Sequence, residues 1–501
     1  MTPTKSGALK QRSSHSSPEP HVAIIGAGLS GLRCADILLR NGFRVTVIEA
    51  RNRIGGRVHQ YPLSNGHFVD LGPNWIHGTA DNPFLDLAKL TNTSVGAFDT
   101  NAWTYHSAGH LLPLKEAEKC RNTTWGIVQQ AFEHSNNHGA ETRVQQSLLD
   151  FFHEKLPSLI PESETEFERK RDAVLQMAEM WGAFVGSPVS RQSLKYFWLE
   201  ECLEGENLFC ASTYKDILTR IAAPALAEAD IKLNSKVQRI WYPSEASGKV
   251  EVELNSGQQL AFDEVVVTTP LGWLKRNMDA FNPALPPRLT QAINSIGYGC
   301  LEKVYISFPR AFWLSPHQDH KMNGLIQWLT PKYAPDSNPH RWHQEAVELA
   351  SLKGQDSHPT LLFYMFGEQS KYVTSKLATL TNRDDESAFL RNFFHPYYSR
   401  LPNYRADSHD CQPEEFVATE WLNDEFAGNG SYCNFQVGLE NGDEDIETMR
   451  EGLPNQGLWF AGEHTAPFVA LGTATGAYWS GEMVGKRISE IYAREGKRDN
   501  T

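Results

Sequence analysis

A glycine-rich turn near the N-terminus is the first stretch of the chain whose residue types and spacing could do chemistry. Gly26, Gly28 and Gly31 form G-x-G-x-x-G directly after the apolar run "VAIIG" and before a mostly apolar segment typical of a helix. The first glycine allows the tight turn, the second lets a pyrophosphate approach the backbone, and the third lets helix and strand pack closely. Glu49 ends the next apolar run, "RVTVIE", where a carboxylate can accept hydrogen bonds from ribose hydroxyls. The pattern predicts a dinucleotide site without separating FAD from NAD.

A lysine in the middle of an expected strand is the second candidate. In "CLEKVYISF" (300–308), Val304, Ile306 and Phe308 alternate onto one face, and Lys303 falls on the other. Lysine commonly blunts an exposed sheet edge, and the strand alone favours that interpretation. The alternative is a functional group directed into a cavity.

The elements that must position these residues follow from hydrophobic periodicity. Residues 21–49 read as strand, turn, helix and strand, which predicts a parallel sheet and an α/β fold. Residues 115–230 are mostly helical in pattern, 231–268 return to strands, and 301–370 mix strands with loops. Residues 458–492 read as a strand followed by a long terminal helix. A chain of 501 residues predicts two domains, which could be interleaved.

Composition limits the partners and the compartment. The formal net charge of −13 argues against nucleic acid as a partner and tolerates a cationic one. The seven cysteines include no CxxC spacing, which fits a reducing compartment without structural disulfides or bound metal. Residues 1–20 read as a disordered tail, and no apolar run approaches a membrane span. The C-terminus "GKRDNT" carries no peroxisomal or ER address, so we expect a cytoplasmic protein.

The residues after Glu49 suggest a family. "EARNRIGGR" (49–57) places Gly55 and Gly56 between Arg53 and Arg57, and this resembles the flavin-containing amine oxidase superfamily. The glycines permit close backbone approach, and an arginine can neutralise phosphate charge. Further segments match the superfamily in the same order, so that the resemblance spans about residues 21–490: "LGPNWIHG" (71–78), "LNSKVQRI" (233–240), "TTPLGWLK" (268–275), and "LWFAGEHT" (458–465) with "GTATGAYWSG" (472–481).

The resemblance implies a Rossmann-like FAD-binding domain interleaved with an α+β substrate-binding domain. We expect the FAD-binding domain to comprise 21–95, 231–300 and 411–501, and the substrate-binding domain to comprise 96–230 and 301–410. The residues that match cofactor positions of the family are Gly26, Gly28, Gly31, Glu49, Arg57, Gly72, Asn74, Trp75, Val237, Glu463 and Thr473.

Within the superfamily the chain is most similar to FAD-dependent polyamine oxidases and the related lysine-specific histone demethylases. Lys303 matches the lysine that holds a water against the reactive edge of the flavin, which is the functional alternative for this strand. His77, in "WIHG", matches a histidine near the substrate amine. Trp421 and Tyr432 match aromatic residues that line the cavity over the flavin.

Two departures from the family pattern qualify these expectations. Some relatives bind FAD through a cysteine whose position corresponds to Gly430, whereas Cys433 lies three positions away, so we expect non-covalent FAD. The family usually has a tyrosine six residues before the glycine matched by Gly476; here that position is Ala470, and Phe468 is the neighbouring aromatic residue.

The resemblance implies a reaction with a small-molecule amine and O2, in which a polyamine such as spermine, spermidine or an N-acetyl derivative transfers hydride to flavin. The imine would be hydrolysed and O2 converted to H2O2. The alternatives are an oxidase of another amine, a histone demethylase-like enzyme and a non-catalytic flavoprotein. The acids Glu200, Glu201, Glu204 and Glu206 could steer a polycation, although the pattern favours a solvated helix face.

Overall fold

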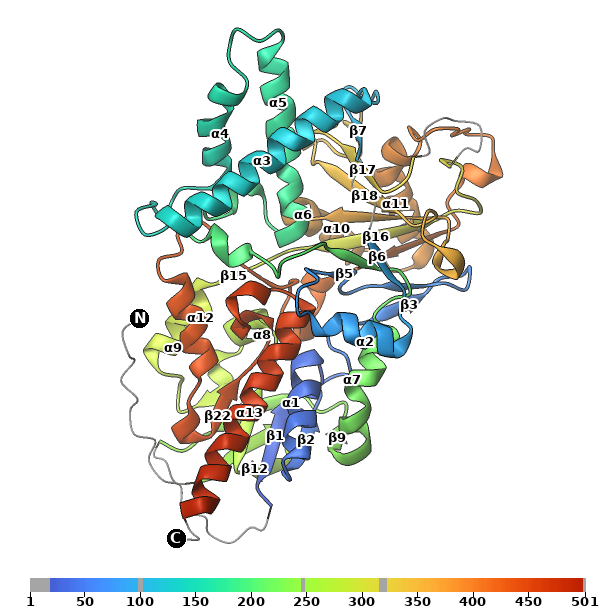
Figure 1. Cartoon of the computed structure of the whole chain (residues 1–501). Coiled ribbons are helices and arrows are strands. Elements are labelled where there is room, and N and C mark those ends of the chain that lie inside the picture. The colour runs from blue at the N-terminus through green and yellow to red at the C-terminus, as the bar shows by residue number, and fades with distance from the viewer. Residues whose placement is uncertain (1–18, 98–101, 245–247, 315–321, 499–501) are drawn as a thin grey trace. The chain divides into compact units, whose positions relative to one another are not determined.

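The computed structural model describes residues 19–97, 102–244, 248–314 and 322–498 (Figure 1). Most of the expected N-terminal tail, residues 1–18, lies outside them. The chain divides into two compact units. Within the described residues, unit 1 comprises 19–59, Lys215–Ile296 and 441–498, and unit 2 comprises Gln60–Tyr214 and Gly297–Glu440.

Unit 1 is built on a parallel sheet of five strands in the order β22-β13-β1-β2-β9. The central strand β1 (His21–Ile25) pairs with β2 (Arg44–Ile48) and β13 (Glu264–Val267), and β9 (Asp230–Lys232) and β22 (Leu458–Phe460) form the edges. Strands β1, β2, β13 and β22 are almost entirely buried, as strands covered on both faces require, and this explains the apolar runs that predict them. Strand β9, at one edge, is partly exposed.

Helices of unit 1 cover this sheet. Helix α1 (Leu29–Arg40) packs against α13 (Ala474–Arg498) and α7 (Lys215–Glu228), so that elements far apart in the sequence lie together (Figure 1). A second sheet, in the order β12-β11-β10-β14, is formed by segments that lie between β9 and β22 along the chain. Its strands and the remaining helices of the unit are β10 (Val237–Trp241), β11 (Val250–Leu254), β12 (Gln259–Phe262), β14 (Phe281–Asn282), α8 (Leu271–Arg276), α9 (Pro287–Ser295) and α12 (Gly442–Glu451).

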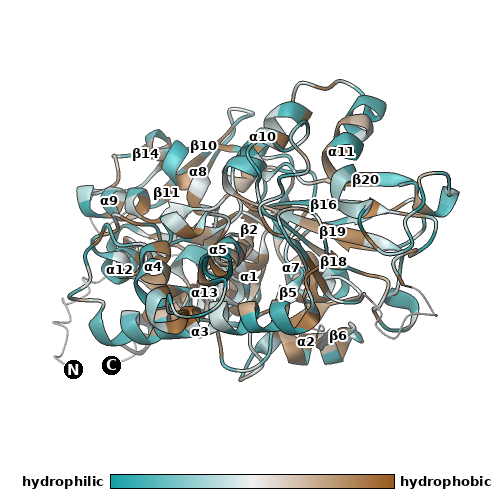
Figure 2. Ribbon diagram, turned by 90° about the horizontal axis from the view of Figure 1, so that it is seen from above, coloured by the Kyte–Doolittle hydropathy of each residue, from teal (hydrophilic) through white to brown (hydrophobic). Residues whose placement is uncertain are grey.

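Unit 2 is organised by a six-stranded sheet in the order β20-β16-β19-β18-β17-β7. Strand β16 (Glu302–Ser307) carries Lys303 and is bonded on both sides, to β19 (Thr360–Met365) and β20 (Glu415–Ala418). The strands β18 (Gln344–Glu348), β17 (Leu325–Trp328) and β7 (Trp103–Tyr105) complete the sheet. Strands β16, β18 and β19 lie side by side in Figure 2.

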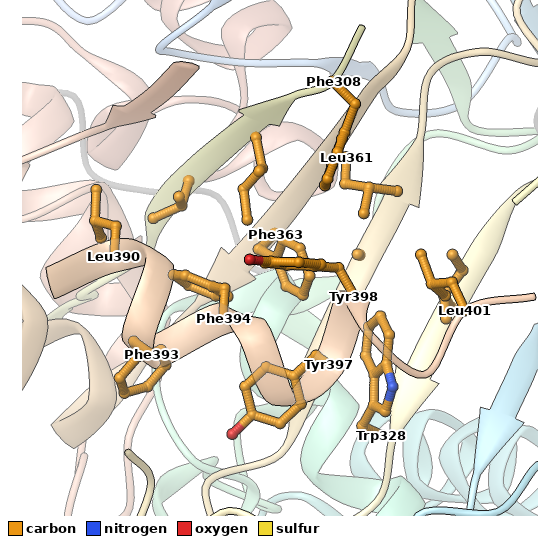
Figure 3. Close-up of a cluster of buried hydrophobic side chains, with 14 of the residues drawn as sticks. Phe308, Trp328, Leu361, Phe363, Leu390, Phe393, Phe394, Tyr397, Tyr398 and Leu401 are labelled. Atoms are coloured by element: carbon orange, nitrogen blue, oxygen red, sulfur yellow. The ribbon is translucent and has the colours of Figure 1, made fainter. Parts of the chain in front are cut away.

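One face of this sheet packs against helix α11 (Arg383–Tyr398) through an aromatic core. Phe363 and Trp328 of the sheet meet Phe394 and Tyr397 of the helix, and the whole cluster is buried (Figure 3). Val304, Ile306 and Phe308 belong to this core, as their alternation predicts. Lys303 therefore projects from the opposite face of the sheet.

The remaining elements of unit 2 are helices and short sheets. The predicted helical region contains α3 (Leu114–His138), α4 (Leu148–Leu159), α5 (Phe167–Ala178) and α6 (Gly182–Val185). The others are β3 (Gln60–Pro62), β4 (Phe68–Asp70), β5 (Trp75–Ile76), α2 (Pro83–Thr91), β6 (Val95–Ala97), β8 (Leu208–Cys210), β15 (Gly297–Tyr298), α10 (Gly367–Leu377) and β21 (Cys433–Asn434).

The unit boundaries differ from the expected domain boundaries. Residues 60–95 and 411–440 group with the six-stranded sheet, and residues 215–230 group with the parallel sheet. The physical reason is strand pairing: β20 joins β16, β5 and β6 join β8, and α7 packs on α1. Pairings between segments distant in sequence are not visible in a one-dimensional hydrophobic pattern.

Candidate active site

The glycine turn of unit 1 leaves an open space in front of the backbone. Gly31 sits where a Cβ would lie 2.0 Å from the Gly26 carbonyl oxygen, so a glycine is required for close packing of turn and helix. A Cβ on Gly28, in contrast, would meet no protein atom within 4 Å. Gly28 is the N-cap of α1, and no side chain caps this helix end. The turn therefore presents open space beside free helical N–H groups, as a phosphate-binding turn does.

Glu49 is held at the neighbouring strand end. Its buried carboxylate accepts hydrogen bonds from the backbone N–H groups of Ala27 and Arg51, each at 2.8 Å. Each carboxylate oxygen has a second lone-pair site, so both can still accept from a ligand. The carboxylate is thus fixed in orientation beside the glycine turn.

Buried polar atoms without partners mark the same edge of the parallel sheet. Ser30 Oγ follows β1, Thr269 Oγ1 follows β13, and both ring nitrogens of His464 follow β22. Carboxyl ends of parallel strands share one edge, which is where open α/β sheets bind ligands. Buried polar groups without hydrogen bonds are costly and call for a ligand or water. These donors and acceptors fit a dinucleotide such as FAD, with its pyrophosphate and hydroxyl groups.

The C-terminal motif contributes a salt bridge and a helix cap. Glu463 pairs with Arg57 at 3.0 Å, which joins the two motif residues directly. Thr473 caps α13: its hydroxyl accepts from the Gly476 N–H at 2.9 Å and donates to the Ala470 carbonyl at 2.7 Å. Val237 begins β10, opposite Leu254. Their expected contacts with FAD stay predictions.

Ala470 stands where the family usually has a tyrosine, and its backbone lies against the last helix. A Cβ on Gly476 would fall 1.9 Å from the Ala470 carbonyl oxygen. The neighbouring aromatic ring, Phe468, lies under the Arg450 guanidinium, with 4.9 Å between them. This contact occupies one face of the ring that we expect to stand in for the missing tyrosine.

Lys303, in unit 2, is a buried lysine on an interior strand. The interpretation as a solvated edge lysine is wrong, because β16 is paired on both sides and the side chain is almost fully buried. Its ammonium group donates to the Gly72 carbonyl and lies 3.4 Å from the Asp70 carbonyl oxygen. The Tyr364 ring centroid is 5.8 Å away. Burial of a lysine is costly, so this placement indicates a function rather than a surface role.

The loop that follows β4 is fixed by side chains of β16 and β19 and by Trp421. Tyr305 donates to the Asp70 carbonyl at 2.6 Å, and the Trp421 indole donates to the Leu71 carbonyl at 3.2 Å. Asn74 donates to the Tyr305 hydroxyl at 3.1 Å and accepts from Tyr364 at 3.0 Å.

Trp75 completes this network by donating to the Tyr364 hydroxyl at 3.1 Å. Lys303 and four other expected site residues, Gly72, Asn74, Trp75 and Trp421, are thus brought together by direct bonds and shared partners.

The carboxylates near Lys303 oppose the effect of burial on its pKa. Burial lowers the pKa of Lys303, and the nearby carboxylates Asp70 and Glu302 act in the opposite direction. Burial also raises the pKa of Asp70, whose carboxylate accepts hydrogen bonds from Gln60 and from the Tyr214 N–H. A lysine whose pKa is brought down towards neutrality can exchange protons with a neighbouring water.

His77 and Tyr432 make other contacts. Burial lowers the pKa of His77, although a hydrogen bond with the Asn207 side chain opposes the shift, so the imidazole is neutral at neutral pH. The Tyr432 hydroxyl donates to the Phe184 carbonyl at 2.6 Å, and the half-exposed Phe184 ring contacts the Trp125 ring. Their roles at an active site stay predictions.

The sequence reasoning missed Tyr305 and Tyr364, which hold the loop, and Asp70, whose charge stabilises the lysine. The only available signal was spacing: Tyr305 is two residues from Lys303 and so shares its face. Tyr364 stands directly opposite Lys303 in the adjacent strand, a relation that requires knowledge of the strand register.

Glu200 is a half-buried carboxyl group rather than part of a freely solvated helix face. It ends a 3-10 helix, Phe197–Glu200, and accepts a hydrogen bond from the Phe435 N–H at 3.2 Å. Burial raises its pKa to about 8, against the effect of the hydrogen bonds from Phe435 and Gln192. Its protonated form is therefore favoured in the folded state.

We expect Glu200→Gln to change the pH dependence of stability. The carboxyl group binds a proton on folding between its unfolded pKa of about 4.3 and its folded pKa of about 8. Its contribution to stability is present below the lower value and is lost as pH rises through the upper one. The Tm of Glu200→Gln minus the Tm of the native protein should therefore increase from pH 5 to pH 8 by at least about 2 °C. Thermal unfolding curves with the same difference at both pH values would contradict this.

Comparison with known proteins identifies the family to which the chain belongs. A sequence model of the family described as flavin containing amine oxidoreductase matches residues 29–489, and the chain belongs to this family. It is therefore an oxidoreductase with FAD as its cofactor and with the amine oxidase fold.

Individual relatives share about a quarter of the residues. The chain is 28% identical over 475 residues to a probable polyamine oxidase 4 from Arabidopsis thaliana, covering 92% of this chain and 86% of the relative. It is 26% identical over 496 residues to polyamine oxidase 3 from Oryza sativa subsp. japonica, covering 95% and 90%. A solved structure of a putrescine oxidase with redesigned cofactor binding superposes with a TM-score of 0.67 at 17% identity, covering 95% of this chain and 99% of that chain. The comparison with the putrescine oxidase structure shows similarity of fold.

The rest of the molecule adds three observations. Across the described ranges, no helix has the length and apolar character needed to cross a bilayer. No group of three or more His, Cys, Asp or Glu side chains within those ranges could hold a metal ion. All seven cysteines lie in the described part of the chain and none forms a disulfide.

Proposed function

We propose that the chain is an oxidase that dehydrogenates a polyamine such as spermine, spermidine or an N-acetyl derivative and passes electrons to O2. The observation that carries this proposal is the buried Lys303, whose ammonium is bonded to the Gly72 carbonyl on an interior strand. The named plant relatives support the polyamine class, at 26–28% identity. The identity is low, so the substrate must be tested directly.

The residues of the chain have distinct roles in this proposal. FAD, when bound, supplies the hydride acceptor and passes the electrons on to O2. Lys303 holds a water and exchanges a proton with it, which its lowered pKa permits. The neutral imidazole of His77 accepts a hydrogen bond from the reacting amine or relays the amine's proton away from it. Trp421 and Tyr432 position the substrate chain.

The substrate amine must lose its proton before the hydride leaves, because an ammonium has no lone pair to assist. A buried, aromatic environment disfavours the charged form of one nitrogen. The Trp75 and Tyr364 side chains, fixed by their mutual hydrogen bond, supply part of this environment. Water then hydrolyses the imine product, and O2 is reduced to H2O2.

The cofactor positions of unit 1 have matching roles. Gly26, Gly28 and Gly31 receive the pyrophosphate, Glu49 accepts from the ribose, and the backbone at Val237 holds the adenine. Arg57 and Glu463, as a salt-bridged pair, bond the cofactor chain. The N-terminus of α13, capped by Thr473, stabilises negative charge at the pyrimidine end of the flavin.

We propose that FAD is bound without a covalent link. At Gly430, where some relatives carry the linking cysteine, a Cβ would lie 2.5 Å from the Tyr298 ring. Cys433 is buried in β21, where it stands opposite Tyr298 of strand β15 in the antiparallel pair. Acid precipitation of the purified protein should release all of the yellow flavin into the supernatant, measured by its absorbance. Flavin that stays with the pellet and with a tryptic peptide would contradict the proposal.

Product analysis tests the substrate class. The purified protein should consume O2 with spermine, spermidine or an N-acetyl derivative and form one H2O2 and one aldehyde per amine cleaved, identified by mass spectrometry. O2 consumption with a monoamine or an amino acid alone would favour the second candidate, an oxidase of another amine. The observation that favours this candidate is Ala470, which removes half of the expected aromatic pair.

The compartment is part of the proposal. Seven cysteines without a disulfide support a reducing environment such as the cytoplasm. Fractionation of the source cells with an antibody to the chain would test this.

A further inference from the structure

A row of polar side chains crosses the six-stranded sheet at the level of Lys303. Strand pairing places Lys303 opposite Tyr364, Tyr364 opposite Glu345, and Glu345 opposite Gln327. Residues directly opposite each other in paired strands project from the same face of a sheet. The row therefore lies on the face away from the aromatic core of α11, with Glu345 two strands from the lysine.

Three members of this row retain solvent-accessible surface that their strand neighbours lack. Lys303 is 5% exposed, and Tyr364 and Glu345 are each 6% exposed. The residues on either side of them along the same three strands are all 0% exposed: Glu302, Val304, Phe363, Met365, Gln344 and Ala346. Residual exposure at three adjacent positions of interior strands indicates that these side chains border one small solvent-accessible space.

The carboxylate at the far end of this space has no cationic partner. Glu345 accepts one hydrogen bond, from the Gln327 amide at 3.1 Å, and no ion pair joins it to a cation in the described parts of the chain. Burial raises its pKa to about 7. A buried carboxylate is normally paired with a cation or fully hydrogen-bonded, so this site is incomplete in the protein alone.

We propose that Glu345 binds the second cationic nitrogen of a diamine or polyamine whose other nitrogen is oxidised at the Lys303 end of the row. This inference rests on the proposed function and names the residue that selects its substrate. Two strand spacings separate Lys303 and Glu345, about 10 Å between their backbones. That span suits an extended aliphatic chain with nitrogens at both ends, and the Tyr364 ring between them gives the chain an apolar surface. Glu345 is a specificity residue here and takes no part in the chemical step.

The test compares an α,ω-alkanediamine with the n-alkylamine of the same length, on the FAD-loaded protein without oxygen. The half-saturating concentration for the change in flavin absorbance is measured for each amine, whether the change is bleaching or a spectral shift. The native protein should prefer the diamine by at least about tenfold, because an ammonium–carboxylate contact in a buried site is worth that much or more. Glu345→Gln should remove this preference by weakening diamine binding and leaving the monoamine unchanged. Glu345→Asp, which keeps the charge, should retain part of it.

Glu348→Gln is the matched control. Glu348 is a buried acid of the same strand, three residues on, so its side chain lies on the other face, where it accepts from Trp313 at 3.2 Å. This variant should keep the diamine preference. An equal effect of Glu345→Gln on both amines, or none on either, would overturn the inference.

Two results separate this inference from the proposed function. Bleaching of the flavin by polyamines with an unchanged diamine preference in Glu345→Gln would sustain the function and overturn the subsite. Spectral shifts without bleaching, together with a preference lost in Glu345→Gln, would sustain the subsite and overturn the function. If Glu345→Gln does not fold, the native protein still decides, because the absence of any diamine preference contradicts the subsite.

Discussion

Replacement of Lys303 by methionine should leave the flavin bound and yellow and slow its reduction by amine, or its reoxidation by O2, by at least about tenfold. Methionine fills a similar volume but cannot hold a water or exchange a proton. The ammonium bonds the Gly72 carbonyl inside a network that also fixes Asn74 and Trp75, so the substitution removes this donor without opening a large cavity. Stopped-flow absorbance measures each half-reaction separately.

The matched control for this variant is Lys371→Met. Lys371 is a surface residue of α10 that pairs with Glu368 of the same helix at 2.7 Å. Its replacement should change neither half-reaction. Native rates for Lys303→Met in both half-reactions would remove the role assigned to Lys303, and loss of the flavin would show that the residue is needed for assembly instead.

Replacement of Gly28 by alanine should weaken FAD binding by roughly 100-fold while the protein without FAD keeps its fold. The added methyl group meets no protein atom within 4 Å, so it occupies open space in front of the turn, where we expect the pyrophosphate to lie. Gly28 has φ −79° and ψ −177°, an extended conformation that alanine adopts without strain. A pyrophosphate that approaches this backbone loses close contacts and hydrogen bonds, and each tenfold of affinity corresponds to about 1.4 kcal/mol.

FAD titration of the apoprotein, followed by tryptophan fluorescence, and far-UV circular dichroism measure the two parts of this prediction. Gly126→Ala is the control, because Gly126 lies inside α3 and its Cβ would also meet nothing within 4 Å. That variant should bind FAD normally and be slightly more stable, since glycine inside a helix costs about 0.5–1 kcal/mol. If Gly28→Ala binds FAD with the affinity of the native protein, the pyrophosphate does not approach the backbone at Gly28, and the prediction is contradicted.

The parts of the molecule that could be predicted from the sequence are those with local signals. The β1–α1–β2 opening has its glycines, its apolar runs and Glu49 within 30 residues, and the structure confirms the strands, the helix and the parallel pairing. The core-facing alternation of Val304, Ile306 and Phe308 is also confirmed. Each signal is contained in one segment, so no knowledge of distant contacts is required.

The parts that could not be predicted depend on pairing between distant segments. Nothing in "LEKVYISF" shows that β16 is paired on both sides, and this fact alone turns Lys303 from an edge residue into a buried one. The position of Glu345 two strands from Lys303 depends on the registers of β16, β19 and β18. For the same reason the unit boundaries at residues 59, 214, 296 and 440 differ from the expected ones.

The central claim is that this chain oxidises a polyamine through its flavin, and the most direct measurement is anaerobic stopped-flow bleaching of that flavin. The protein would be mixed with spermine, spermidine, their N-acetyl forms, a monoamine and several amino acids, and the absorbance near the ordinary flavin maximum followed. We predict rapid, saturable bleaching by at least one polyamine and slower bleaching by the monoamine and the amino acids. A bound flavin that none of the polyamines bleaches would contradict the claim.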